Sequence, residues 1–203
     1  MTRCSRPVDV NIGVLALQGN VREHIDAFCL AVDRIDPGGR SEVFEVRSPS
    51  DLAECHVLAI PGGESTAISR LIEKNHLHEL LRTFTGGIFA TCAGMVLMAA
   101  DVADSRIRPL GLIDMAVDRN AFGRQRESFE ADISISGIEG GPFHAIFIRA
   151  PVGTSAGSNV RVLARIEQGI VAVEQGKHMA FSFHPELSGD TRLHERFLRM
   201  QEL

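Results

Sequence analysis

Short apolar runs that alternate with helical patterns occupy the first half of the sequence, and they limit its fold more than any other feature. Most of these runs are apolar at successive positions, which is typical of strands buried on both faces of a sheet. Between them, apolar residues recur at intervals of three and four, as in Val21, Ile25, Phe28 and Val32, which indicates helices. This alternation predicts a parallel sheet covered on both sides. The expected strands are 10–17, 42–47, 56–60 and 87–91, and the expected helices are 20–35, 65–81 with a break near Asn75, and Ala93 onward.

The second half changes to short strands separated by turn signals, with a hairpin tip at residues 174–177. We expect these strands to extend the sheet in antiparallel fashion, and a helix from Thr191 to about Met200 to close the fold. The predicted fold class is α/β, a three-layer sandwich with a mostly parallel central sheet, an antiparallel extension and helices on both faces. Because the chain has 203 residues, 44% of them hydrophobic, we expect a single domain over residues 1–203. The expected strands of this half are 112–117, 128–136, 145–151, 160–166, 169–175 and 178–183.

Charge and cysteine content argue against several classes of function. The net charge is −5 with no long run of either sign, so neither nucleic acid nor an anionic membrane surface is an expected partner. The sequence has neither a secretory signal nor an apolar run that could span a membrane, and its four cysteines favour a reducing compartment. We therefore expect a cytoplasmic protein. Cysteines and histidines lack the clustered spacing of a zinc site, so we expect no metal and no cofactor.

Three turns rich in small residues follow predicted strands, at residues 18–19, 61–65 and 91–94. Because ligands bind beyond the carboxyl ends of the strands in open α/β sheets, these turns form the candidate site. Cys92 lies at a strand-to-helix turn, where a nucleophile elbow places its catalytic residue. The start of the following helix supplies N–H groups and a positive dipole end, which favour a thiolate. A free thiol is mostly protonated at neutral pH, so Cys92 needs a base.

His184, at the end of a late predicted strand, is the candidate base. Residues two apart in an extended segment face the same side, so Glu186 can reach the second imidazole nitrogen. Cys92, His184 and Glu186 thus provide a nucleophile, a general acid/base and an orienting carboxylate. Taken alone, a cysteine between apolar runs is more often a small core residue, and a His-Pro-Glu sequence is unspecific. Their coincidence with the PGGES turn at 61–65 favours catalysis.

Five motifs occur in order along the chain: PGGEST at 61–66, TCAG at 91–94, RNAFGRQRESFEADI at 119–133, FIRAP at 147–151 and SFHPEL at 182–187. Together they resemble the glutaminase subunits of pyridoxal phosphate synthase, which are class I glutamine amidotransferases. The similarity spans nearly the whole chain, from GVLALQG at 13–19 to the terminal helix. One position departs from the family pattern, because Ala90 stands where the family usually has glycine two residues before the nucleophile.

The resemblance implies hydrolysis of L-glutamine to glutamate and ammonia, with the ammonia passed through a protein channel to a synthase subunit that builds the ring of pyridoxal phosphate. In the family pattern Cys92 attacks the side-chain amide carbon and forms a thioester. His184, oriented by Glu186, protonates the departing ammonia and then activates water. Backbone N–H groups of Gly63 and Ala93 would form the oxyanion hole.

The resemblance also implies a pocket for the amino-acid end of glutamine. Glu64 would pair with the α-ammonium, while Arg119 and the Ile148-Arg149 step would complete the side that holds the α-carboxylate. Outside this motif context, Glu64 and Arg119 would be interpreted as solvated surface or as a structural ion pair. The implied substrate-binding residues are Gly62, Gly63, Glu64, Arg119, Ile148 and Arg149.

Three other functions compete with this interpretation. A glutaminase of another pathway, or another cysteine protein with a similar elbow, is disfavoured by the RNAFGRQ and FIRAP motifs. A non-catalytic adapter that docks to a synthase is disfavoured by the intact set of Cys92, His184 and Glu186. On the first predicted helix, His24 could belong to a protein contact, and Cys29 is expected to be a core thiol.

Overall fold

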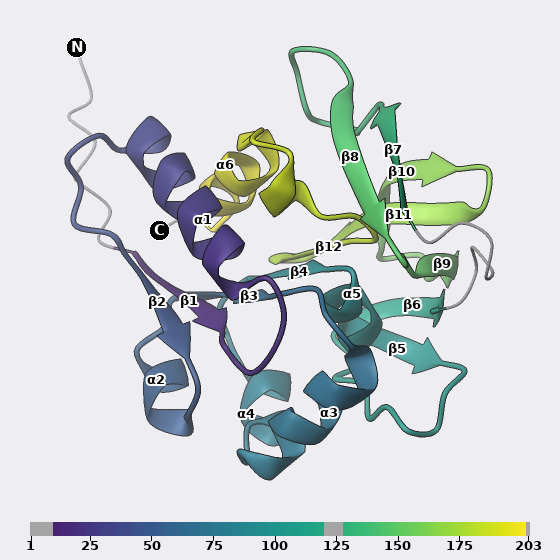
Figure 1. Cartoon of the computed structure of the whole chain (residues 1–203), viewed down its shortest axis with the longest axis horizontal. Helices are drawn as coiled ribbons and strands as arrows, with labels where there is room; N and C mark the ends of the chain where they lie inside the picture. Colours follow the sequence, from purple (N-terminus) through teal and green to yellow (C-terminus); the bar gives the residue numbers. More distant parts are fainter. Residues whose placement is uncertain (1–9, 120–127, 202–203) are drawn as a thin grey trace.

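The computed structural model describes residues 10–119 and 128–201 of the chain. Residues 120–127, which carry most of the RNAFGRQ motif, therefore lie outside the described residues. A central sheet separates two groups of helices (Figure 1). Within the described ranges, no helix combines the length and the apolar character that crossing a membrane demands.

Five parallel strands form the half of the sheet nearer the N-terminus, in the order β2, β1, β3, β4 and β12. β3 and β4 are buried at every position, which explains their uninterrupted apolar sequences. The strands are β1 (Asn11–Leu15), β2 (Glu42–Val46), β3 (Val57–Ile60), β4 (Ile88–Thr91) and β12 (His178–Phe181).

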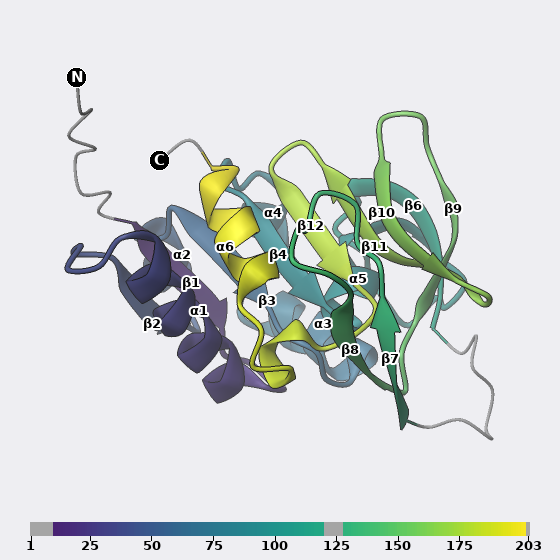
Figure 2. The ribbon, with the colours of Figure 1, turned by 90° about the horizontal axis from the view of Figure 1, so that it is seen from above.

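Helices cover both faces of this half, and each face has its own hydrophobic core. Phe28 of α1 and Phe197 of α6 belong to one core. Figure 2 shows these two helices side by side on the same face of the sheet. Ile72 of α3 and Leu81 of α4 belong to the other core, together with side chains of α2 and α5. The helices are α1 (Val21–Ile35), α2 (Pro49–Ala53), α3 (Ser65–Lys74), α4 (His78–Arg82), α5 (Ala93–Met98) and α6 (Arg192–Arg199).

A hairpin of β11 and β12 joins the parallel half to an antiparallel extension, in which β9 and then β6 follow β11. At the far edge β5 pairs in parallel with β6, whereas β10 pairs with β11 outside this order. The strands are β5 (Ala99–Val102), β6 (Ile113–Asp118), β9 (Val152–Ala156), β10 (Arg161–Ile166) and β11 (Gly169–Gln175). The predicted fold class is confirmed, with its parallel half, its antiparallel extension and its helices on both faces.

Two of the expected sheet strands lie elsewhere. The strands expected at 128–136 and 145–151 do not join the main sheet but form a separate ribbon of β7 (Ser128–Ile133) and β8 (Phe143–Ile148). Phe129 and Phe147 stack within this ribbon, with ring centroids 4.5 Å apart. Alternating apolar residues therefore identified the strands correctly, but not their partners. The patterns in the sequence did not predict α2, β5 and β9.

The direction of β12 is what brings distant residues to one end of the sheet. β12 runs parallel to β4, with Phe181 beside Thr91, and the Cys92 N–H donates to the Phe181 carbonyl at 2.7 Å. Both strands therefore end at the same edge. The chain leaving β12 passes beside Cys92 and enters the 3-10 helix η1 (Pro185–Leu187).

Candidate active site

Cys92 connects β4 to α5 in a backbone conformation that side chains rarely adopt, with φ 48° and ψ −106°. Such conformations cost about 1–3 kcal/mol and cluster at functional sites. Small neighbours make the turn possible, since a Cβ on Gly94 would lie 2.3 Å from the Ile60 carbonyl oxygen and 3.2 Å from Ala90 Cβ. The methyl group of Ala90 fits beside the bare Gly94, so the elbow forms with alanine at this position.

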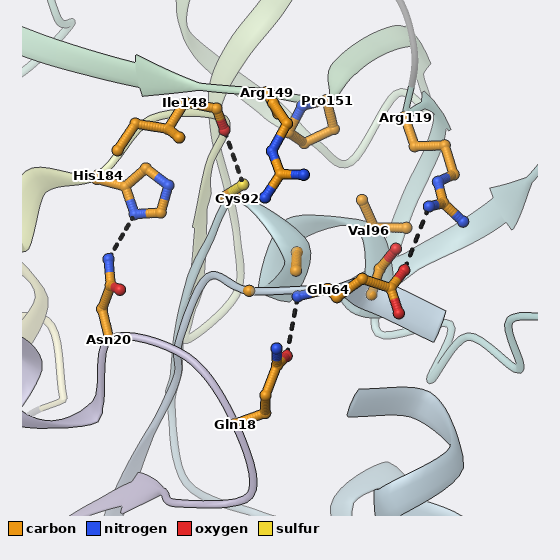
Figure 3. A pocket seen from close by; sticks show the side chains of 13 residues that line it. Gln18, Asn20, Glu64, Cys92, Val96, Arg119, Ile148, Arg149, Pro151 and His184 are labelled. Atoms are coloured by element: carbon orange, nitrogen blue, oxygen red, sulfur yellow. Dashed lines mark hydrogen bonds and ion pairs between the residues drawn. The ribbon is translucent and has the colours of Figure 1, made fainter. Parts of the chain in front are cut away.

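The structure brings Cys92, His184 and Glu186 together. Nδ1 of His184 lies 2.7 Å from Oε1 of Glu186, and both side chains are buried. Figure 3 shows the other ring nitrogen of His184 facing the sulfur of Cys92. The sulfur also lies 3.7 Å from the Ile148 carbonyl oxygen. A thiol, an imidazole and a carboxylate are thus aligned in the order that nucleophilic catalysis requires.

The pKa values of the imidazole and the carboxylate are displaced in opposite directions. Burial lowers the pKa of His184, but hydrogen bonds with Cys92 and Glu186 and their charges outweigh it and raise the pKa to about 10. Burial raises the pKa of Glu186, but the neighbouring imidazoles of His24 and His184 outweigh it and lower the pKa to about 2. These shifts favour a positive imidazolium next to the sulfur, the environment of a reactive cysteine.

The local route to this geometry differs from the expected one. His184 and Glu186 do not share the face of an extended strand, because Pro185 begins the 3-10 helix η1 and Glu186 lies inside it. Proline is favoured at the first position of a helix, so Pro185 was the available signal for this turn. The His184 N–H donates to the Ile146 carbonyl at 2.8 Å, and Figure 2 shows β8 beside this segment.

Two supporting residues were missed or misjudged from the sequence. Nδ2 of Asn20 lies 3.3 Å from Glu186 Oε1 and 3.4 Å from His184 Nδ1. The suggestion that His24 belongs to a protein contact is wrong, because its side chain is fully buried behind Glu186. Both residues follow the 18–19 turn, Asn20 as the N-cap of α1 and His24 in its first turn, where the His24 N–H donates to the Asn20 carbonyl at 3.2 Å. The expectation that Cys29 is a core thiol is also wrong, because this residue is exposed.

A cavity of about 350 Å³ opens beside the sulfur. Of the predicted catalytic, substrate-binding and oxyanion residues, all line this cavity except Gly62 and Glu186. Gly62 instead packs against the imidazole, since a Cβ there would lie 2.4 Å from His184 Cε1. The lining residues are Gln18, Asn20, Gly63, Glu64, Ser65, Cys92, Ala93, Val96, Arg119, Ile148, Arg149, Pro151 and His184.

Glu64 and Arg119 have structural partners as well as places in this cavity (Figure 3). The Glu64 carboxylate caps α3 by accepting the Ala67 N–H at 2.7 Å and the Thr66 N–H at 3.2 Å. Burial raises the pKa of Glu64, but a hydrogen bond from the Thr66 hydroxyl at 2.6 Å, together with these two backbone bonds, outweighs it and lowers the pKa. Arg119 lies 3.4 Å from Glu64 Oε1 and 2.6 Å from Asp104 Oδ2. Glu64 and Arg119 therefore do form the structural ion pair that was the alternative to a binding role, and both residues also line the cavity.

Comparison with solved structures identifies the class of protein that shares this fold. A crystal structure described as a glutamine amidotransferase superposes with a TM-score of 0.83 and 42% identity, covering 95% of this chain and 99% of the other. A putative GMP synthase protein from Thermoplasma acidophilum shares the fold, with a TM-score of 0.62 at 12% identity, covering 96% of this chain and 95% of the other. The fold is thus that of the glutamine amidotransferases.

The chain belongs to the SNO glutamine amidotransferase family, whose model matches residues 14–203. It is 65% identical to a protein of Methanoregula boonei over 94% of this chain and 98% of that protein. It is 66% identical to a protein of Methanosphaerula palustris over 94% of this chain and 97% of that protein. Both relatives are named pyridoxal 5'-phosphate synthase subunit PdxT. The predicted family and enzyme class are confirmed.

Proposed function

We propose that this chain is the glutaminase subunit of a pyridoxal phosphate synthase and hydrolyses L-glutamine to glutamate and ammonia. The observation that carries this proposal is the convergence of Cys92, His184 and Glu186 beside one cavity. The names of the relatives support the pathway. At about 350 Å³, the cavity has the volume of a small ligand pocket, which suits a single amino acid.

Catalysis begins when the sulfur of Cys92 attacks the side-chain amide carbon of glutamine. His184, protonated at the nitrogen that faces the sulfur, gives this proton to the amide nitrogen as the carbon–nitrogen bond breaks, and ammonia departs. The product is a thioester between Cys92 and the glutamyl group. His184 then takes a proton from water as the water attacks the thioester, which releases glutamate and the thiolate. Glu186 holds the ring in one orientation throughout.

Both tetrahedral intermediates carry an oxyanion, which the backbone N–H groups of Gly63 and Ala93 stabilise. The two residues line the same cavity next to Cys92, which supports this assignment. Removal of one such donor typically costs about 3 kcal/mol of transition-state stabilisation.

The amino-acid end of glutamine lies toward the outer part of the cavity. The Glu64 carboxylate pairs with the α-ammonium of glutamine there, and Arg119 and Arg149 provide positive charge for the α-carboxylate. Ile148 shapes the wall next to the sulfur, whereas Gly62 lies outside the lining and supports the site by packing against the imidazole of His184.

The ammonia passes through a protein channel to the synthase subunit, which is the expected partner, and glutaminase activity requires that partner. We also propose that residues 1–203 form one glutamine amidotransferase domain, which the family match over residues 14–203 supports.

The test is ammonia release from glutamine by the wild-type chain and by Cys92→Ala, each with and without the synthase subunit. We expect little activity alone, substantial activity with the partner and none from Cys92→Ala. Full activity of the variant would overturn the catalytic assignment. A wild-type chain that stays inactive with a competent synthase would instead favour the adapter.

A further inference from the structure

A second histidine lies directly behind the predicted triad. His24 projects from the first turns of α1 and is fully buried. Its Nε2 lies 3.0 Å from Thr91 Oγ1 and 3.5 Å from Glu186 Oε1. The imidazole therefore contacts the residue before the nucleophile and the carboxylate that orients His184.

Thr91 extends these contacts to the turn after β3. The Gly62 N–H donates to Thr91 Oγ1 at 3.0 Å, and Gly62 directly precedes the predicted oxyanion donor Gly63. One buried ring thus links three segments that are distant in sequence: the elbow, the 61–63 turn and the segment that follows β12.

The surroundings of His24 determine its protonation. The titratable groups that face it are Glu186 and His184 from the segment after β12, His194 from α6 and Glu23 from its own helix. Burial, more than any of these charges, lowers the pKa of His24, so the ring is neutral at neutral pH. The nitrogen that faces an ionised carboxylate carries the hydrogen, because a lone pair there would be repelled. Among the described residues Nδ1 has no hydrogen-bond partner, which fits an unprotonated Nδ1.

We propose that His24 is a positioning residue of the glutaminase site. Its Nε2–H holds the Glu186 carboxylate against His184 and, through the Thr91 hydroxyl, fixes the peptide of Gly62 beside the oxyanion donor. This inference rests on the proposed glutaminase function. His24 does not touch the substrate, so it acts on the chemical step through Glu186 and the 61–63 turn rather than on glutamine binding.

The chain supplies a matched control in His194. This histidine on α6 is fully buried in the same core and lies against Phe89, with ring centroids 4.7 Å apart. Within the described chain neither of its ring nitrogens has a hydrogen-bond partner. Replacement of His194 by leucine therefore reports the cost of changing a buried imidazole in this core without breaking a hydrogen bond to the site.

The experiment compares His24→Leu, His24→Gln and His194→Leu, each assembled with the synthase subunit. Thermal unfolding, kcat, KM and the pH profile of kcat/KM are measured for each. His24→Leu is expected to lower kcat about 10- to 100-fold with little change in KM, because it removes both the 3.0 Å hydrogen bond with Thr91 and the 3.5 Å contact with the charged Glu186. It also shifts the acidic limb of the pH profile to higher pH, because the pair of Glu186 and His184 binds a proton more readily without this donor.

The amide nitrogen of His24→Gln can lie where Nε2 lies, so this variant is expected to restore most of kcat and the position of the acidic limb. His194→Leu is expected to change the unfolding temperature but not the acidic limb. If His24→Leu does not fold, His24→Asn replaces it, since its shorter amide cannot reach Thr91 and is expected to lose kcat where His24→Gln keeps it.

The inference is overturned if a folded His24→Leu keeps the wild-type kcat and pH profile, or if it merely repeats the behaviour of His194→Leu. In both cases the wild-type protein still hydrolyses glutamine and Cys92→Ala does not, so the proposed function survives. Loss of the proposed function itself is recognised separately, by an inactive wild-type complex.

Discussion

Gly62 offers the sharpest test of the site geometry, because its lack of a side chain makes room for the imidazole. A Cβ at this position would lie 2.4 Å from Cε1 of His184 and 3.1 Å from Cβ of Cys92. Carbon atoms in contact are about 3.5 Å apart or more. In Gly62→Ala the ring, or the turn that carries the new methyl group, must therefore move by about 1 Å.

A shift of this size is expected to be costly at His184, the proposed general acid/base. The ring of His184 is held by Glu186 at 2.7 Å and its backbone by Ile146 at 2.8 Å, so it cannot move away without lengthening these bonds. Misplacement of a reacting group by about 1 Å costs about 100-fold in rate. Overpacking of a tight site costs a further 1–3 kcal/mol or so in unfolding free energy. We expect Gly62→Ala to lower kcat about 100-fold and to destabilise the fold moderately.

The assay is ammonia release in the complex with the synthase, together with urea unfolding of the isolated chain. Gly13→Ala is the matched control, since a Cβ on this residue of β1 would lie equally close, 2.4 Å, to Cys55 Sγ, away from the triad. Both variants should lose stability, but only Gly62→Ala should lose kcat beyond its loss of folded protein. A Gly62→Ala enzyme with wild-type kcat would refute the argument.

Two further predictions concern carboxylates of the site. The Glu186 pKa of about 2 lies below its unfolded value of 4.5, so its stabilisation, about 3 kcal/mol at most, is present above pH 4.5 and is lost as the pH falls through 2. Urea unfolding should thus show a steeper fall in stability across this window for the wild type than for Glu186→Gln. Glu64→Gln keeps an oxygen that caps α3 but loses the charge, so its unfolding free energy should change by less than about 1 kcal/mol. Its KM for glutamine should rise about tenfold or more, and an unchanged KM would argue against contact with the α-ammonium.

The sequence predicts the part of the fold that burial dictates. Uninterrupted apolar runs followed by turns of small residues identified β3 and β4, together with the edge of the sheet where the site lies. β9 and β5 were not predicted because their sequences, VGTSA and AADV, each contain one valine and otherwise only small or polar residues, and only their neighbours in the sheet make them strands. The ribbon of β7 and β8 was visible as strands, but period-two alternation does not specify which sheet a strand joins.

The same division holds for the candidate site. Residue type, strand-end position and the coincidence with the PGGES turn predicted that Cys92, His184 and Glu186 meet, although a 3-10 helix rather than the expected extended segment places Glu186. Nothing in a single histidine on an amphipathic helix distinguishes His24 from a surface residue, because its place behind Glu186 depends on how α1 packs against the sheet. The contacts of Asn20 depend on the same packing. Residues that support a site by tertiary contact alone leave little trace in sequence spacing.

The direction of β12 decides whether this fold can bring His184 next to Cys92. β12 returns from the antiparallel hairpin with β11 and runs parallel to β4, so the carboxyl ends of both strands meet at one edge. An antiparallel β12 would place its carboxyl end beside Ile88, three residues back along β4 from Thr91, and at about 3.3 Å per residue His184 would lie about 10 Å from the elbow. No imidazole reaches a sulfur over that distance. The three-layer architecture alone is therefore insufficient, and the parallel pairing of Phe181 with Thr91 is the structural requirement for the site.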